Sequence, residues 1–205
     1  MVFDEESYQD QMYSDVPVEG VAAGTTFTLC GFRDAVFAEG LLVKGCVFER
    51  CVFVGCTFKN VRFENCAFNT CVFKTADFMG AAFKNCRLMG AELLGARCTG
   101  MRIEGGDWSY ANLAGLKFVR QTLTKVRLCE ASLARCAFRE CDLTECDLTR
   151  ATVRGAAFEG CDLRGSRLDG VAVAEARWTG SRIDLLQCVT IAQEVTGAVF
   201  DEFGE

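Results

Sequence analysis

Every fifth residue of this chain is large and apolar, and the pattern continues from Phe27 to Ile183. It is clearest in the stretches CVFERCVFVGCTFKN, which begins at Cys46, and CAFRECDLTECDLTR, which begins at Cys136. A period of five residues fits neither an α-helix, with 3.6 residues per turn, nor a strand that alternates every two residues. Such a short and regular repeat predicts a solenoid, in which one small unit stacks on the next.

The large apolar residues fall into two registers. The main register runs from Phe48 to Ile183 without a break. An earlier register, one residue out of step, holds Phe27, Phe32, Phe37 and Leu42, and we place the single extra residue at Gly45. None of these positions is charged, although charged residues make up 24% of the chain. We therefore expect all of these side chains to face one dry interior.

A small residue, usually Ala or Cys, stands two positions before most of the large ones. Because Ala takes the place of Cys at this position in other repeats, we interpret the cysteines there as small buried hydrophobic side chains. Metal binding is disfavoured because the chain has no His and the spacing is not CxxC. Disulfides between cysteines one coil apart, such as Cys46 and Cys66, are the other alternative, but we expect them to stay reduced in a cytoplasmic protein. Cys129 and Cys188 are expected to be exposed. The cysteines at the small position are Cys30, Cys46, Cys51, Cys56, Cys66, Cys71, Cys86, Cys136, Cys141, Cys146 and Cys161.

Four segments, ANLAG at Ala111, CDLTE at Cys141, CDLTR at Cys146 and CDLRG at Cys161, resemble the consensus A(D/N)LXX of the pentapeptide-repeat family. The resemblance covers residues 25–185. It implies an all-β fold, a right-handed quadrilateral β-helix with four pentapeptides per coil. Residues 25–184 would then form a shaft of about eight coils, on the order of 40 Å long at the spacing of paired strands.

Both ends of the shaft need covers, because a solenoid otherwise exposes apolar side chains and unpaired backbone groups. Residues 1–24 are acidic and irregular in pattern, and we expect them to lie over the first coil or to be loose. In residues 185–205, Asp184 is a candidate N-cap for a short helix that stops at Gly197. This helix has more apolar residues than one face can bury, which favours dimerisation over the alternative of a simple cap. The candidate dimerisation residues are Leu185, Leu186, Val189, Ile191, Ala192, Val195 and Phe200.

The charges are unevenly distributed. The chain has a net charge of −6, yet all 22 Lys and Arg lie between residues 25 and 185, together with 18 of the 28 acids. One group of acids in the second half is a candidate partner-binding patch, and the alternative is a set of solvated surface ion pairs. Direct nucleic-acid binding is disfavoured, because the cations are scattered and lack an aromatic platform. The candidate patch consists of Glu140, Asp142, Glu145, Asp147 and Asp162.

The chain shows no pattern typical of an enzyme. With no His, a Ser–His or Cys–His nucleophile pair is impossible. The glycines recur as turn residues rather than in a phosphate-binding loop before a helix. We expect no catalysis, no cofactor and no metal. No apolar run reaches the length of a membrane span, and the acidic start lacks the pattern of a signal peptide, so we expect a cytoplasmic protein without membrane contact.

Within the pentapeptide-repeat family, the chain most resembles the topoisomerase-protecting group of MfpA, Qnr, AlbG and McbG type. The residues that carry this resemblance are FENCAF at Phe63, FKNCRL at Phe83 and the ending GSRIDLLQCVTIAQEV at Gly180. The resemblance implies a homodimeric DNA mimic that binds DNA gyrase or topoisomerase IV and counters a topoisomerase poison. The net charge of +4 on the shaft argues against a uniformly acidic mimic. The competing hypothesis is a structural or regulatory scaffold that binds another cytoplasmic protein.

Overall fold

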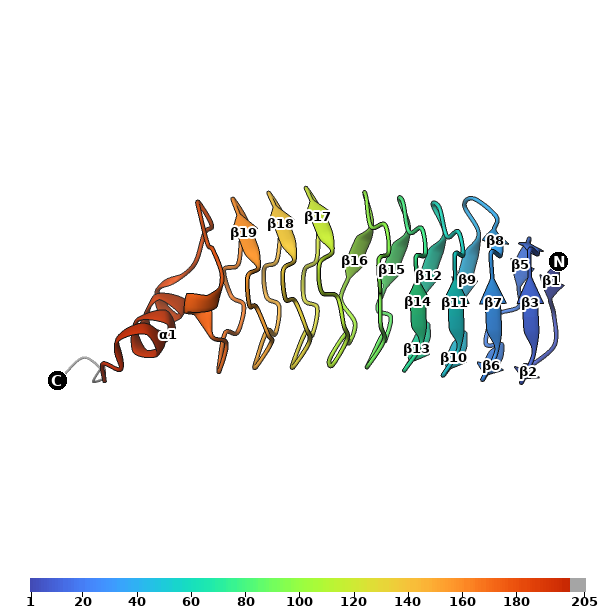
Figure 1. Cartoon of the computed structure of the whole chain (residues 1–205), viewed down its shortest axis with the longest axis horizontal. Coiled ribbons are helices and arrows are strands. Elements are labelled where there is room, and N and C mark those ends of the chain that lie inside the picture. Colours follow the sequence, from blue (N-terminus) through green and yellow to red (C-terminus); the bar gives the residue numbers. More distant parts are fainter. Residues whose placement is uncertain (200–205) are drawn as a thin grey trace.

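The computed structural model describes residues 1–199 as a four-sided β-solenoid of about eight coils that ends in one short helix (Figure 1). The coils lie side by side along the long axis, with the N-terminus at one end and the helix at the other. The predicted quadrilateral β-helix is therefore confirmed. Each side of the shaft is a stack of very short parallel strands and single β-bridges contributed by successive coils.

We name the four sides by their strands. Face I holds β9 (Leu42–Lys44), β12 (Arg62–Glu64), β15 (Ala82–Lys84) and β16 (Arg102–Glu104), and β1 (Val2–Phe3) pairs with β5 (Gly20–Val21) at its N-terminal end. Face II holds β2 (Ser7–Gln9), β6 (Thr26–Thr28), β10 (Val47–Glu49) and β13 (Ala67–Asn69). Face III holds β3 (Met12–Ser14), β7 (Gly31–Arg33), β11 (Val52–Val54) and β14 (Val72–Lys74). Face IV holds β4 (Pro17–Val18), β8 (Val36–Phe37), β17 (Lys117–Val119), β18 (Ala137–Arg139) and β19 (Ala157–Glu159).

Beyond these strands, single β-bridges carry each face toward the C-terminus. On face II, for example, Arg87, Asp107, Arg127 and Asp147 bridge in turn, each one coil beyond the last. The 3-10 turn η1 (Val173–Glu175) and the helix α1 (Leu185–Thr196) complete the chain. Residues at the same place in consecutive coils therefore lie one above the other, which fixes the neighbours of every surface side chain.

The interior is a continuous stack of aromatic and aliphatic side chains. Phe48 lies parallel to Phe27 and to Phe68, with ring centroids 4.8 and 4.7 Å apart. Rings from adjacent faces meet edge to face, as Phe63 and Phe68 do at 5.2 Å. Both geometries are favourable for aromatic pairs. The repeat thus buries its large residue on every face, as the period of five predicts, and leaves the two flanking positions to face outward.

The corners of the square lie two positions after the large residues and have positive φ, which explains why Gly and Asn stand at many of them. Asn65 and Asn85 have φ of 54° and 51°, in the left-handed region that Asn tolerates better than most residues. Gly106 is not at a corner but at a small position, two residues before Trp108; it has φ of 97°, and a side chain there would clash with the carbonyl oxygen of Cys86. Glycine is required at this position by both the conformation and the close approach.

The predicted register shift is misplaced. Val43, not Leu42, points inward: Val43 is fully buried and pairs with Phe63, whereas Leu42 is exposed. The extra residue therefore lies in the turn between Phe37 and Val43, and Gly45 is an ordinary corner residue with φ of 64°. Sequence reasoning failed here because either of two adjacent apolar residues satisfies the pattern.

Residues 1–24 are not irregular, which corrects a second expectation. They form β1 to β5, and these strands continue the parallel ladders of the shaft. Tyr8 stacks on Phe27 at 5.2 Å and Tyr13 on Phe32 at 5.1 Å, so both do lie over the coil that follows. Phe3 is fully buried beneath them. The N-terminal segment is thus built like the shaft that it covers.

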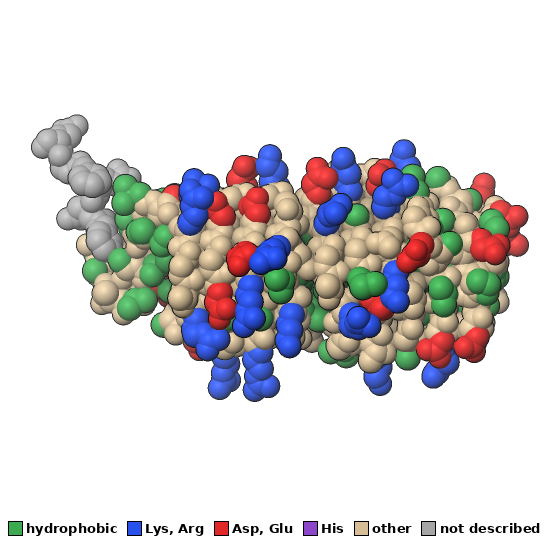
Figure 2. Space-filling model, turned by 90° about the horizontal axis from the view of Figure 1, so that it is seen from above, with side chains coloured by type: hydrophobic (Ala, Val, Ile, Leu, Met, Phe, Trp, Pro, Cys, Tyr) green, Lys and Arg blue, Asp and Glu red, His purple; other side chains and the backbone are tan. Residues whose placement is uncertain are grey.

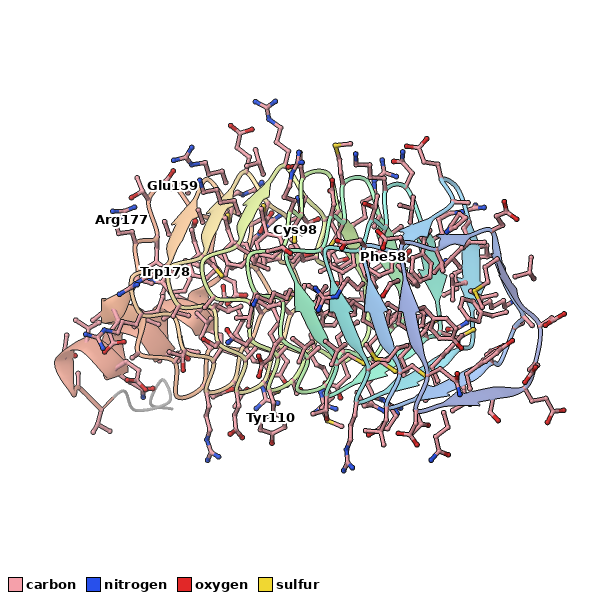
Figure 3. The ribbon with its side chains drawn as sticks, turned by 45° about the vertical axis from the view of Figure 1, so that its right-hand side comes forward. Phe58, Cys98, Tyr110, Glu159, Arg177 and Trp178 are labelled. Atoms are coloured by element: carbon pink, nitrogen blue, oxygen red, sulfur yellow. The ribbon has the colours of Figure 1, made fainter. Side chains whose placement is uncertain are left out.

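The shaft changes its packing near its middle, from Cys98 to the start of β17. Cys98 takes the position of a large residue, and Leu116 takes that of a small one in the next coil; both are buried (Figure 3). In the same region Gly106 precedes the fully buried Trp108 by two positions. We interpret these exchanges as compensation, since a close-packed interior must conserve its total side-chain volume. The aromatic stack of the first half ends at the edge-to-face contact of Phe83 with Trp108.

Candidate protein-binding surfaces

The five acids of the candidate patch lie on face I, on its two corners and on face II. Asp142 and Asp162 form consecutive β-bridges on face I, so one lies above the other. Glu140 and Glu145 occupy the corners before and after Asp142, with φ of 52° and 56°. Asp147 follows on face II. The structure therefore brings four of the five acids together around one face, and places the fifth just beyond a corner.

Four of these five carboxylates have a cation close by, one coil away or within the same coil. Arg120 lies 2.7 Å from Glu140, and Lys125 lies 3.6 Å from Glu145. Arg167 lies 3.9 Å from Asp147. The pairs are mostly solvent-exposed, and pairs of this kind contribute little to stability. The candidate patch is thus a ladder of alternating charges rather than a bare acidic surface.

Asp162 is the most strongly paired of the five acids. Arg164 lies 2.7 Å from its carboxylate and Arg182 lies 3.7 Å from it. The hydrogen bonds from Arg164 lower the pKa of the Asp162 carboxyl, with the charge of the guanidinium acting in the same direction. Asp142 differs, since within residues 1–199 it has no ion pair and accepts hydrogen bonds from the backbone N–H and hydroxyl of Thr144.

The cationic partners were missed in the sequence, although a signal for them was present. Arg120 precedes Glu140 by one coil, and Lys125 precedes Glu145 by the same interval. Because four pentapeptides make one coil, residues 20 apart in the sequence are neighbours on the surface. A search for opposite charges 20 residues apart therefore finds both pairs. A second ladder lies on face IV, where Glu159 is 3.0 Å from Arg139 and 3.7 Å from Arg177. Figure 3 labels Glu159 and Arg177. Figure 2, which shows the molecule from above, has blue and red side chains interspersed along the shaft.

The C-terminal helix is capped as the sequence predicts. The carboxylate of Asp184 accepts from the backbone N–H of Gln187, and Gln187 returns the contact to the backbone of Asp184. Gly197, with φ of 68°, ends the helix. The carboxylate of Asp184 also accepts from the backbone N–H of Gly165, and these two hydrogen bonds lower its pKa. Asp184 therefore ties the helix to the last coil.

One side of α1 covers the last coil of the shaft, and the other side is exposed to solvent. The buried amide of Gln187 donates to the carbonyl oxygens of Leu163 and Ser166, which satisfies backbone groups at the end of the solenoid. Ile191 packs against the core. Leu185 and Leu186 remain 74% and 77% exposed, and green apolar side chains gather at this end in Figure 2. The helix is thus a cap with an unpartnered apolar side.

The candidate dimerisation residues divide between these two sides. Leu185, Leu186 and Val195 are exposed, whereas Val189, Ile191 and Ala192 are half-buried. Phe200 lies outside the described residues. Only the exposed residues are free to meet a second protein.

The thiols lie where the sequence predicts, except that Cys129 is half-buried rather than exposed. All eleven cysteines at the small position are buried and free, Cys129 is half-buried and Cys188 is exposed. Several buried thiols donate to backbone carbonyl oxygens, as Cys66 does to Val43 at 3.3 Å. Burial raises the pKa of the Cys56 thiol to about 11 and that of Cys136 to about 12. These cysteines are structural side chains of the core.

Three family models match the chain and together span residues 22–165. The model described as "Pentapeptide repeat region" matches residues 46–131. The models described as "Pentapeptide repeats", with 8 and 9 copies, match residues 127–165 and 22–67. The chain belongs to the pentapeptide-repeat family. Comparison with curated protein sequences finds no match.

Solved pentapeptide-repeat proteins share this fold along its length. A trypsin-treated variant of QnrB1, a plasmid-mediated fluoroquinolone resistance protein, aligns with a TM-score of 0.78 and 22% identity over 97% of this chain and 99% of that one. Full-length QnrB1 aligns with a TM-score of 0.61 and 20% identity over 93% and 99% of the two chains. HetL of Nostoc sp. strain PCC 7120, involved in heterocyst differentiation regulation, aligns with a TM-score of 0.59 and 17% identity over 86% and 84%. At this level of identity the likeness establishes the fold.

The single α-helix of the described residues, α1, is too short to cross a membrane. With the interior filled by side chains, the outer faces and the two ends are the surfaces available to other molecules.

Proposed function

We propose that this protein is a non-enzymatic rod that binds a type II topoisomerase, DNA gyrase, as a DNA mimic, and so gives resistance or self-immunity to a topoisomerase poison. The observation that carries the proposal is an unbroken, filled shaft that aligns with QnrB1 over nearly its whole length. Since the interior side chains leave no room for a substrate, function falls to the outer surface. A narrow rod with carboxylates on its sides fits a cationic groove built for duplex DNA.

The acids of the C-terminal half are the proposed contacts. Asp142 and Asp162 lie in one column on face I, with Glu140 and Glu145 on the corners beside them. Asp142 has no ion pair within residues 1–199, and the cationic partners of Glu140 and Glu145 lie in exposed pairs that contribute little to stability. A cationic partner surface can therefore compete for these carboxylates at a small cost in stability.

Dimerisation through α1 is part of the proposal. Leu185 and Leu186 project from the end of the rod, and a two-fold contact there would bury both from each copy. Two shafts joined end to end would make a rod of roughly 80 Å. The acids of face I lie in the half of the shaft nearest this contact, so both copies would present them on either side of the two-fold axis.

A second function, a scaffold that binds and regulates another cytoplasmic protein, is favoured by one observation. The acids of the candidate patch alternate with arginines and lysines along the ladder, which is not the continuous negative surface of a simple DNA mimic. HetL, which shares the fold, is involved in the regulation of heterocyst differentiation.

Direct binding to purified DNA gyrase separates the two functions. Immobilised protein should bind gyrase in a biolayer interferometry experiment, and duplex DNA should compete for the same site. The variant Asp142→Asn/Asp162→Asn should bind more weakly, whereas Glu49→Gln/Glu64→Gln, with the same change in charge near the N-terminal end, should bind as the unmodified protein does. Binding that duplex DNA does not displace would favour the scaffold, and no binding would rule out the topoisomerase proposal.

A further inference from the structure

Face III differs from the other three sides of the shaft. Ion pairs between coils cross face I at Lys84–Glu104, face II at Asp107–Arg127 and face IV at Asp77–Arg97. Among residues 1–199, no ion pair involves the outward side chains of face III. This side of the rod has no charge ladder to hold its neighbouring coils together.

The N-terminal part of face III is apolar instead. Met12 on β3 is 73% exposed, Val52 on β11 is 41% exposed, and Leu29 at the adjoining corner is 48% exposed. Gly31 on β7 lies between Met12 and Val52 in the ladder and carries no side chain. A Cβ at Gly31 would clash with the sulfur of Met12, so the Met12 side chain folds across this glycine. The result is a shallow groove of about 260 Å³ on the outside of the sheet.

Three aspartates stand at the corners on either side of face III, next to the residues that line this groove. Asp10 stands at the corner between faces II and III, and Asp15 and Asp34 stand at the corner between faces III and IV. All three are exposed, and none forms an ion pair within the described residues. Arg33 is the only cation that lines the groove. Residues 1–40 as a whole hold eight acids and one arginine, and red side chains crowd the N-terminal end in Figure 2.

We propose that this groove, between Met12 and Val52 with Asp10 on one side and Asp15 and Asp34 on the other, is a docking site for a basic amphipathic segment of a partner protein. Aliphatic side chains of the segment would cover Met12, Leu29 and Val52, and its lysines or arginines would meet the aspartates. Charge complementarity selects this occupant. A second copy in symmetric contact would instead bring two acidic ends together, which is unfavourable. The proposal does not depend on the topoisomerase function.

A synthetic peptide of alternating Leu and Lys tests this docking site by fluorescence anisotropy. Two variants of the full chain test the charged part and the apolar part of the docking site separately. Asp10→Asn/Asp15→Asn/Asp34→Asn removes the charge, and Asn tolerates the positive φ of these positions. Met12→Ser/Val52→Thr removes the apolar surface without disturbing a buried residue. We expect each variant to weaken peptide binding by about tenfold, and a peptide of alternating Leu and Glu not to bind.

Matched variants elsewhere on the rod make the test specific. Glu64→Gln/Glu92→Gln/Glu175→Gln removes the same charge from other places, and Val36→Thr/Val119→Thr changes two equally exposed valines on face IV. Both should bind the Leu–Lys peptide as the unmodified chain does. The proposal is overturned if the peptide does not bind, or if these controls lose as much affinity as the groove variants. It is also overturned if light scattering shows a self-association that Met12→Ser/Val52→Thr abolishes, since the occupant is then a second copy.

Discussion

The guanidinium Nε of Arg120 donates to the carboxylate of Glu140, one coil further along the shaft, across 2.7 Å. This pair is the shortest contact between oppositely charged side chains of neighbouring coils in residues 1–199. It shows how the solenoid neutralises its own acidic side chains. A carboxylate on one coil forms an ion pair with a cation at the same place on a neighbouring coil. The surface charge available to a partner is therefore set by these ladders rather than by composition.

Removing cations from this ladder should strengthen the proposed interaction with gyrase. In Arg120→Gln/Lys125→Gln, the carboxylates of Glu140 and Glu145 lose their partners and become available to a cationic surface. Because both pairs are exposed to solvent, the free energy of unfolding should change little. Interferometry should show tighter binding to gyrase. The matched variant Lys59→Gln/Arg97→Gln, which frees Asp77 on face IV, should leave gyrase binding unchanged; equal tightening in both would mean that net charge alone matters.

The aromatic stack should be sensitive to truncation. Phe68 lies parallel to Phe48 and edge-on to Phe63 and Phe73. Phe68→Ala should lower the free energy of unfolding by about 3–5 kcal/mol, because it leaves a cavity in a close-packed interior. Phe68→Asp should fail to fold, since it buries a charge without a partner. Urea denaturation followed by circular dichroism measures both, with the exposed Lys74→Ala as a control expected to change stability by less than about 0.5 kcal/mol. A cooperatively folded Phe68→Asp protein would contradict the dry interior.

Thiol reactivity should separate surface from core. The exposed Cys188 should react with Ellman's reagent first and the half-buried Cys129 more slowly. Burial raises the pKa of Cys56 to about 11, which leaves few thiolates at neutral pH and none that the reagent can reach. The remaining thiols should react only in denaturant. Cys188→Ser should remove the fast phase; rapid reaction of several thiols in the folded protein would mean that the coils open.

The exposed side of α1 should control the oligomeric state. Leu185→Asp/Leu186→Asp should give monomers by light scattering, while the β-sheet signal of the shaft persists in circular dichroism. Both leucines point away from the core, so the shaft should keep its stability. Glu194→Lys, an exposed change on the same helix, should leave the dimer intact. If the unmodified protein is already a monomer at micromolar concentration, α1 is only a cap.

The sequence predicts the interior well because one rule, a large apolar residue every five, repeats without a charged exception from Phe48 to Ile183. It fails where the rule is locally ambiguous. Leu42 and Val43 are both apolar, so only the pairing of Val43 with Phe63 settles which one is buried. Phe3, Tyr8, Tyr13 and Val18 are also five apart, but the acids between them conceal the repeat.

The surface was less predictable than the core, since a side chain's neighbours there come from other coils. The acids Glu140 and Glu145 were identified, but not the cations that neutralise them. The groove beside Gly31 was missed as well, because it depends on Met12, Gly31 and Val52 being stacked in one column. Both the ion pairs and the groove become visible when the sequence is written with one coil of four pentapeptides in each row. The register shift before Val43 must be included in that alignment.

DNA supercoiling by purified gyrase is the decisive assay for the topoisomerase proposal, run with and without a fluoroquinolone or another topoisomerase poison, across a range of concentrations of this protein. We expect the protein to inhibit supercoiling on its own or to restore it in the presence of the poison, and we expect Asp142→Asn/Asp162→Asn to weaken this effect. A protein that leaves supercoiling unchanged under both conditions would contradict the topoisomerase function.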